Sequence, residues 1–213
     1  PRKLLSFTNR NGFHFAIDRT NGQFVGGGAF AKQTWAKGLD DSGRPIVLPN
    51  TSPTPEGNLV YPGLGGSSNW AAPAYNPLTN MIYVQATEDC GQHFYKQVRP
   101  YEVGEHFENG GGRNVMGEEP YGVLKAIEAT TGKVVWGYKM QNRSGANVLS
   151  TVTGLVFSGT AEGEFFALDA KNGKLLWSFP GGSRIGGGPV TYLVDGKQRI
   201  AVPVGASLMV FGL

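Results

Sequence analysis

Hydrophobic residues in this chain come in short runs separated by polar turns. The clearest stretch is 154–179, where the apolar runs LVF, FFAL and LLW are separated by a Gly-containing tetrad and by Asn172-Gly173. In the last run Leu175, Trp177 and Phe179 recur with a period of two, which is typical of a half-buried antiparallel strand. Asn-Gly between two such runs predicts a hairpin with a type I′ turn, because both residues tolerate positive φ. The pattern therefore predicts a β-meander.

This meander is part of a repeat. Residues 126–136, AIEATTGKVVW, match residues 167–177, ALDAKNGKLLW, position for position at an offset of 41 residues, and both copies end in Trp. Degenerate copies without the Trp occur at 16–26 and 74–84. A unit of about forty residues made of short strands is typical of a propeller blade. The alternative is a chance similarity between ordinary hairpins, and four copies argue against it.

The remainder of the chain also favours strands over helices. Further strands are expected at 2–8, 13–18, 189–194, 199–204 and 208–213. The glycines of 26–33 predict a loosened passage, and 38–58 is expected to be a long surface excursion with only one short strand, at 46–48. No periodicity marks 87–120, which is expected to be a long loop, either functional or an insertion. The predicted fold class is all-β.

Composition and charge narrow the function classes. The 213 residues include 33 glycines and 13 prolines without a collagen-like period, which indicates many turns between short strands. The net charge is +3 with scattered Lys and Arg, so the sequence offers no basic stripe for nucleic acid. No apolar stretch reaches membrane-spanning length. The chain begins Pro1-Arg2-Lys3 and passes directly into an apolar run, so we expect the interior of a longer protein, with any export signal upstream.

Most reactive side chains lack the spacing of a site. Cys90 is the single cysteine, so an internal disulfide and a Cys-based metal centre are excluded, and it is expected to be half-buried in a loop. His14, His93 and His106 show no ligand spacing, and the acidic pairs 40–41 and 118–119 are expected to be solvated charge.

Three residues beside turns are the sharpest candidates for binding. Arg10 lies in the Asn9–Gly12 turn, and Asn69-Trp70 precedes a strand. A fixed cation, an amide and a flat aromatic ring could together bind a planar anionic ligand. The alternative is that Trp70 is a packing aromatic at a strand entry and Arg10 a solvated turn residue.

Four motifs give the chain a resemblance to a known family. They are PRKLLSFTNRNGFHFAIDRTNG at 1–22, SSNWAAPAYNPLTNMIYV at 67–84, LKAIEATTGKVVW at 124–136, and the stretch 148–179 that begins VLSTVTGLVFSGT. Together with 189–205 they resemble the C-terminal part of quinoprotein alcohol dehydrogenases, the enzymes that use pyrroloquinoline quinone (PQQ). The terminal repeats are shared with non-enzymatic relatives, whereas the first two motifs are more specific.

The resemblance implies a structure and an activity. It implies that 1–213 forms about half of an eight-bladed propeller whose blades are four-stranded antiparallel meanders with Trp motifs. The full-length protein would oxidise alcohols or sugar alcohols by hydride transfer to PQQ held over Ca²⁺ or a lanthanide, and electrons would pass to a cytochrome c. The resemblance further implies a bacterial periplasmic enzyme in which Arg10, Asn69 and Trp70 contact the cofactor.

The same resemblance sets limits. The family's catalytic Asp, metal ligands and vicinal cysteine pair would lie upstream, so no catalytic residue or metal ligand is expected in this chain, and the isolated chain is expected to be inactive. Gly145 stands where many members carry an aromatic residue. The alternative, from another class, is a non-catalytic PQQ-repeat propeller that serves as a scaffold or protein-binding module.

Overall fold

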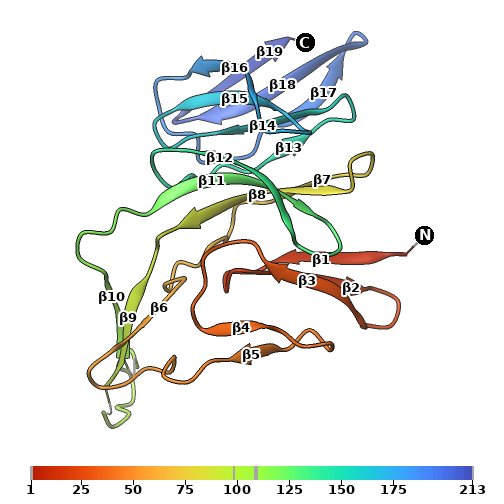
Figure 1. The fold of residues 1–213 in the computed structure, drawn as a ribbon. Coiled ribbons are helices and arrows are strands. Elements are labelled where there is room, and N and C mark those ends of the chain that lie inside the picture. Colours follow the sequence, from red (N-terminus) through yellow and green to blue (C-terminus); the bar gives the residue numbers. More distant parts are fainter. Residues whose placement is uncertain (1, 98, 108–109, 213) are drawn as a thin grey trace.

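The protein is all-β, as predicted. A computed structural model describes residues 2–97, 99–107 and 110–212, and these form nineteen strands and no helix (Figure 1). Among these described residues there is consequently no helix with the length and hydropathy to cross a membrane.

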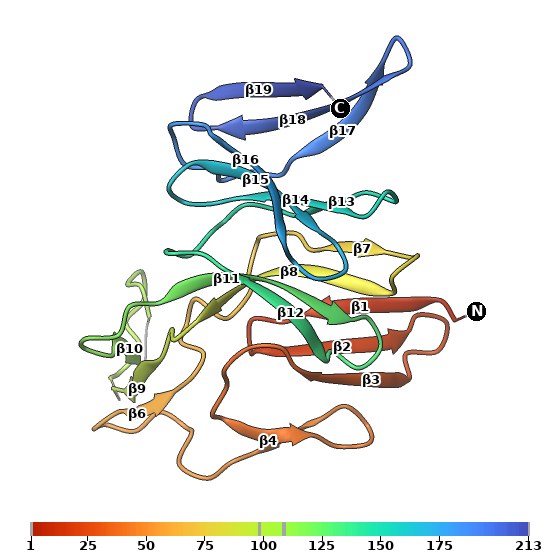
Figure 2. The same cartoon turned by 45° about the horizontal axis from the view of Figure 1, so that its top comes forward.

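Four sheets of the propeller-blade type lie one on another (Figure 2). The first contains β1 (Leu4–Thr8), β2 (Phe13–Asp18) and β3 (Phe24–Ala29). The second has the order β12-β11-β8-β7 and contains β7 (Ala74–Asn76), β8 (Met81–Glu88), β11 (Tyr121–Glu128) and β12 (Val134–Lys139). The third contains β13 (Leu149–Ser150), β14 (Leu155–Gly159), β15 (Glu164–Asp169) and β16 (Leu175–Pro180). The fourth contains β17 (Val190–Val194), β18 (Lys197–Val204) and β19 (Ser207–Gly212).

The core lies between consecutive sheets. Tyr83, Leu124 and Phe166 belong to a buried cluster between the second and third sheets. An equivalent cluster joins the third to the fourth sheet, and another packs the second sheet against Phe30 and Ala31, directly after β3. Each fully buried aromatic or aliphatic side chain of this kind contributes about 1.5–3 kcal/mol. Apolar contacts between neighbouring parts of the stack therefore hold the sheets together.

The repeat motif encodes a specific turn. In all three copies whose hairpin joins the last two strands of a sheet, the turn glycine N–H donates to the carbonyl of the acidic residue, over 2.8–2.9 Å: Gly22 to Asp18, Gly132 to Glu128, and Gly173 to Asp169. The acidic side chain accepts further backbone N–H groups, for example that of Lys171 at Asp169. The expected type I′ turn at Asn172-Gly173 is therefore wrong. Of the two turn residues, Gly173 has positive φ and Asn172 does not. The turn is longer than a type I′ turn because Asp169 accepts backbone N–H groups from Lys171 and Gly173 and so closes it.

Trp136 joins its sheet to the next. Its ring lies against Gly173, where a Cβ would be 2.5 Å from the indole, and its Nε1 donates to Ala170 O over 3.1 Å. Trp177 contacts Phe211 of the fourth sheet, with ring centroids 5.4 Å apart. Both Trp residues thus pack on a neighbouring sheet, as the repeat predicts.

His14 makes the corresponding link in the first sheet, where Gly26 stands in the Trp position. Its Nε2 lies 2.8 Å from Ala129 O, and Ala129 is the repeat equivalent of Ala170. The side chain is fully buried and its Nδ1 has no partner among the described residues. Burial lowers the pKa of His14, so the ring is neutral and donates from Nε2.

The glycines of 26–33 do not loosen the chain. Gly26 and Gly28 belong to β3, and a Cβ on either would lie 2.6–2.8 Å from the carbonyl oxygens of Thr130 and Thr131. These glycines let the turn of the second sheet approach the first, so a strand replaces the expected loosened passage.

Both expected loops contain strands. In 38–58 the expected short strand is present as β5 (Pro45–Val47), and it pairs with β4 (Ala36–Leu39), which was missed. In 87–120, β9 (Gln92–Lys96) pairs with β10 (Gly110–Asn114) and with β6 (Asn58–Val60). Positions 98, 108 and 109 of this segment lie outside the described residues. Within this expected loop, Gly111 and Gly112 of β10 lie opposite Tyr95 and Phe94 of β9.

The four repeat copies are not distributed as one copy in each sheet. Residues 74–84 form the β7–β8 hairpin of the same sheet whose other hairpin is 126–136, and eight residue pairs between β8 and β11 join the two. The fourth sheet contains no copy. The strands at 189–194 and 199–204, however, lie where they were expected, joined by Asp195-Gly196 with positive φ at both residues.

The His14 link should make stability depend on pH. Because the folded-state pKa is lowered, the unfolded chain binds a proton below its ordinary pKa of about 6.5 that the folded chain does not. The free energy of unfolding should therefore fall between about pH 7.5 and 5.5, by at most about 1.4 kcal/mol per pH unit. Urea unfolding of the dilute chain measures this.

Two variants isolate the effect. His14→Gln retains an N–H donor without titrating, so its stability should change less over this range than that of the wild type. His93→Gln, at an exposed position in β9, is the matched control and should keep the full pH dependence. Equal pH dependence in wild type and His14→Gln would contradict the assignment.

The outer faces of the stack predict self-association. Val190 and Val210 flank Ala201 in the fourth sheet and, with Leu208, are half-exposed or more on the face away from the third sheet. Leu5 and Phe7 of β1 are likewise exposed. Apolar surface and unpaired strand edges of this kind associate. Sedimentation velocity of the 213-residue chain should show concentration-dependent oligomers.

Lysine substitutions test which surface is responsible. Leu208→Lys with Val210→Lys should shift the chain toward monomer, whereas Leu78→Lys, in the exposed β7–β8 turn, should not. A wild-type chain that stays monomeric at all concentrations would refute the prediction.

Candidate functional site

One large cavity opens where loops of the second and third sheets meet the segments around them. Its volume is about 1080 Å³, and polar residues and glycines dominate its lining. The lining comes from five parts of the chain, within 63–71, 85–92, 114–120, 141–147 and 161–186. It includes the predicted Asn69 and Trp70.

Arg10 lies against the cavity wall without lining the cavity. The Asn9–Gly12 turn is fixed by Asn9 and Asn11, whose side chains accept backbone N–H groups over 3.0–3.1 Å. Arg10 O accepts from Ser67 N over 3.0 Å, and its guanidinium donates to Leu64 O. Both partners belong to the loop that lines the cavity. The structure thus places Arg10 behind this loop, with Asn69 and Trp70 at its far end.

Trp70 is 92% exposed. Among the described residues Trp70 thus does not pack as a core aromatic. Its backbone is nevertheless held, because Ala72 N donates to Asn147 Oδ1 and Val148 N donates to Ala72 O, each over 3.0 Å. Asn69 is also exposed, and its Nδ2 donates to Gly65 O over 3.2 Å. A flat ring on a fixed backbone, beside an amide, is suited to stacking on a planar ligand.

A chain of hydrogen bonds supports the wall behind Asn147. Gln85 is buried, and its Nε2 donates to Ser158 Oγ over 2.8 Å, while Ser158 Oγ donates to Asn147 O over 3.0 Å. Because the second and third sheets each supply members of this chain, their packing sets the shape of the cavity.

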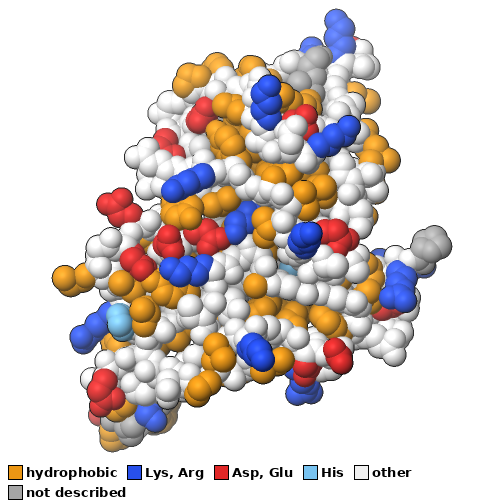
Figure 3. Space-filling view, in the orientation of Figure 1, with side chains coloured by type: hydrophobic (Ala, Val, Ile, Leu, Met, Phe, Trp, Pro, Cys, Tyr) orange, Lys and Arg blue, Asp and Glu red, His pale blue; other side chains and the backbone are white. Residues whose placement is uncertain are grey.

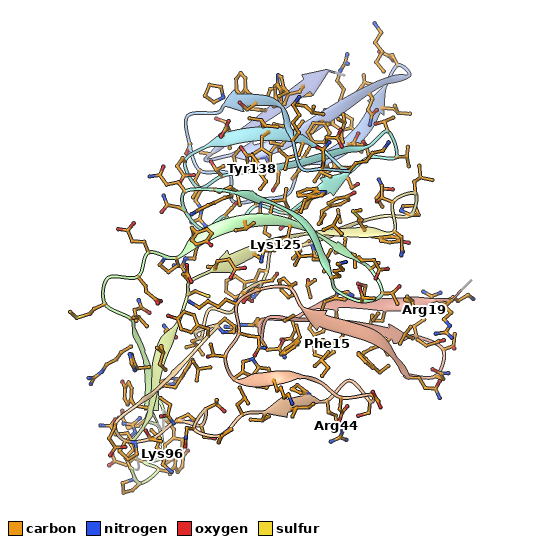
Figure 4. The ribbon with its side chains drawn as sticks, viewed as in Figure 1. Phe15, Arg19, Arg44, Lys96, Lys125 and Tyr138 are labelled. Atoms are coloured by element: carbon orange, nitrogen blue, oxygen red, sulfur yellow. The ribbon has the colours of Figure 1, made fainter. Side chains whose placement is uncertain are left out.

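Charged groups form a network beside the cavity. Lys125, near the centre of the molecule in Figure 4, is largely buried, pairs with Glu88 and donates to Phe30 O over 2.6 Å. Lys32 pairs with Asp89 over 2.8 Å, and this hydrogen bond raises the pKa of Lys32. These contacts tie the segment after β3 to the end of β8.

Tyr61 and Glu118 form the next contact of this network. The hydroxyl of Tyr61 donates to the Glu118 carboxylate, and this bond is the main reason that the pKa of Tyr61 is raised. Glu118 was expected to be solvated charge, and this bond corrects that expectation.

The other candidates do not form a reactive centre. Cys90 is half-buried, as expected, and burial raises the pKa of its thiol. His14 packs between sheets, His93 lies in β9, and His106 lies in a peripheral loop. Within 2–97, 99–107 and 110–212 no group of three or more His, Cys, Asp or Glu could hold a metal ion. Charges of both signs are mixed over the face shown in Figure 3, without a basic stripe.

Sequence reasoning missed several residues of the cavity. Arg143 and Arg184 line it, as do Gln85 and Asn147. The signal for the two arginines was present, because they lie 41 residues apart, at the offset of the repeat. The amides carried no local signal.

Comparison with known proteins indicates the structural class of the chain. Residues 120–211 match a family model described as outer membrane protein assembly factor BamB. This match covers the regular repeats and, with the stacked sheets, defines a segment of a PQQ-type β-propeller.

Relatives of known activity match nearly the whole chain. The quinoprotein alcohol dehydrogenase PedH of Pseudomonas putida is 38% identical over 95% of this chain and 36% of its own length. The 1-butanol dehydrogenase (cytochrome c) of Thauera butanivorans is 33% identical over 96% of this chain and 31% of its own length. The chain spans about a third of the length of these relatives.

Solved structures give the same result. The quinohemoprotein alcohol dehydrogenase of Comamonas testosteroni matches with a TM-score of 0.84 and 28% identity, over 98% of this chain and 32% of that one. A europium-containing methanol dehydrogenase matches with a TM-score of 0.79 and 28% identity, over 93% and 36%. The chain is thus similar, over nearly its whole length, to about a third of the length of quinoprotein alcohol dehydrogenases, which confirms the resemblance of its motifs.

Proposed function

We propose that the full-length protein is a PQQ-dependent dehydrogenase that oxidises alcohols or sugar alcohols and passes the electrons to a cytochrome c in the bacterial periplasm. The observation that carries this proposal is the 38% identity to PedH over nearly the whole chain. The relative from Thauera, named for cytochrome c, supports the electron acceptor. In this proposal the chain supplies part of the cofactor pocket.

The residues of the cavity fit such a cofactor. PQQ is a planar polycarboxylate that, when bound, accepts hydride from the alcohol carbon. The exposed ring of Trp70 offers a flat stacking surface, and Asn69 beside it offers an amide donor. Arg10 lies behind the Leu64 carbonyl at the same loop, where its charge favours an anion. We propose these three residues as the cofactor contacts of this chain.

The catalytic base and the metal ligands are proposed to lie in another part of the protein. No described group of His, Cys, Asp and Glu could hold Ca²⁺ or a lanthanide. The chain corresponds to only about a third of its relatives, so most of the enzyme's length is elsewhere.

A second function is a non-catalytic propeller that acts as a scaffold. The match of 120–211 to the BamB-described model favours it. The two proposals differ outside the described cavity, since only the enzyme requires a base and a metal site. Assay of the full-length gene product therefore distinguishes them.

The isolated 213-residue chain is the matched control for this assay of the full-length protein. The full-length protein with PQQ and Ca²⁺ or a lanthanide should reduce an artificial electron acceptor when an alcohol is supplied. The 213-residue chain under the same conditions should show no turnover, because it lacks a described base and metal site. Turnover by the isolated chain would contradict the proposed division of the site. Absence of turnover in the full-length protein would favour the scaffold.

Trp70→Ala in the full-length protein tests the proposed cofactor contact. Because the ring is exposed, its loss should change the free energy of unfolding by no more than about 0.5 kcal/mol. Loss of stacking, about 0.5–1.5 kcal/mol, should weaken PQQ binding by roughly two- to tenfold. Fluorescence titration with PQQ measures the affinity.

Leu78→Ala is the control for this variant. Leu78 is also largely exposed, in the β7–β8 turn, but does not line the cavity, so its loss should leave PQQ affinity unchanged. Wild-type affinity in Trp70→Ala would remove Trp70 from the site. Arg10→Ala is less direct, since it also frees the Leu64 carbonyl.

A further inference from the structure

Two arginines occupy the same position in consecutive repeats. Arg143 follows β12 and Arg184 follows β16, and each is followed two residues later by a glycine that also lines the cavity. They lie 41 residues apart, the offset that relates Trp136 to Trp177. The connections after the last strands of the second and third sheets therefore each present an Arg-x-Gly segment to one cavity.

Each guanidinium group lies close to the backbone of a glycine. A Cβ on Gly145 would be 3.1 Å from Nη2 of Arg184, and a Cβ on Gly65 would be 3.8 Å from Nη1 of Arg143. The absence of a side chain at Gly145 thus leaves room for Arg184 on the wall. A larger residue there would displace the guanidinium.

The arginines are not neutralised within the described part of the chain. Neither belongs to an ion pair or a side-chain hydrogen bond among those residues. The carboxylates of the lining are in part occupied, Asp89 by Lys32 and Glu118 by the Tyr61 hydroxyl. Glu119, next to Glu118 in the segment before β11, also lines the cavity. Two guanidinium groups without an ion pair among the described residues favour an anionic group in the part of the cavity beside them.

We propose that Arg143 and Arg184 select an alcohol that carries a carboxylate, that is, a hydroxy acid. The proposal rests on the proposed dehydrogenase function and names its substrate class. A guanidinium presents a rigid fork of donors that matches a carboxylate, so the arginines bind the acid end of the substrate and leave the hydroxyl to react. Their role is specificity and positioning.

A pair of substrates tests this in the full-length holoenzyme. Gamma-hydroxybutanoate carries the carboxylate, and butanol is a neutral alcohol with the same number of carbons. Wild-type enzyme should show the higher kcat/KM with the hydroxy acid. Arg184→Gln should lower that value by about tenfold or more, since a charge-assisted contact is lost, and leave butanol unchanged.

Three variants accompany it. Arg143→Gln should act in the same direction, and Arg184→Lys should recover part of the loss because the charge is kept. Arg44→Gln, in the exposed turn between β4 and β5, is the control and should change neither substrate. Equal kcat/KM for the two substrates in the wild type, or equal loss of both in Arg184→Gln, would overturn the proposal.

Calorimetry with succinate distinguishes this proposal from the proposed dehydrogenase function on which it rests. Succinate has no alcohol carbon to oxidise, so only its binding is measured. Succinate should bind the full-length protein, and Arg184→Gln should bind it about tenfold more weakly. If no alcohol is turned over but succinate binds in this way, the dehydrogenase fails and the anion site stands. If Arg184→Gln weakens PQQ instead of succinate, the arginines hold the cofactor and the proposal is overturned.

Discussion

The structure depends on one contact between consecutive sheets: an aromatic N–H that donates to a carbonyl in the turn of the next sheet. Trp136 makes it to Ala170, and His14 makes it to Ala129. The turn that offers the carbonyl is itself closed by the acidic residue and glycine of the repeat. The acidic residue and glycine of the repeat therefore encode the acceptor turn, while the donor comes from the repeat Trp in the second sheet and from His14, outside the repeat, in the first.

This docking fixes the cavity as well as the core. Once the second and third sheets are held together, Val148 N donates to Ala72 O and Ala72 N donates to Asn147 Oδ1, and these bonds hold the loop that carries Trp70. The side chain of Trp70 is left exposed because it takes no part in that docking. Stability and ligand contact are thus assigned to different residues of the same wall, so substitutions can separate them.

The sequence predicted what is local and periodic. Strands at 13–18 and 199–204, the hairpin at Asp195-Gly196 and the packing of Trp136 followed from alternation, turn chemistry and repeat spacing. It failed where a distant segment decides the conformation. Gly26 and Gly28 form a strand because the turn at Thr130 and Thr131 approaches them, and no local pattern reports that approach.

The site was harder to predict for the same reason. Asn69 and Trp70 were found beside a turn, and both line the cavity. Arg143 and Arg184 were overlooked because each is an isolated basic residue in a connection between strands. The comparison of repeat positions, together with the fold, places both in one cavity lining.

The repeated and the irregular parts of the chain both line the cavity. The arginines come from repeat-equivalent segments, whereas Glu118 and Glu119 come from the long segment between β8 and β11, which interrupts the second sheet. Asp89, at the start of that segment, is paired with Lys32, whereas Glu118 accepts a hydrogen bond from the neutral Tyr61 hydroxyl and so keeps its charge. A ligand in the cavity consequently meets cations from the repeat and carboxylates from the inserted segment.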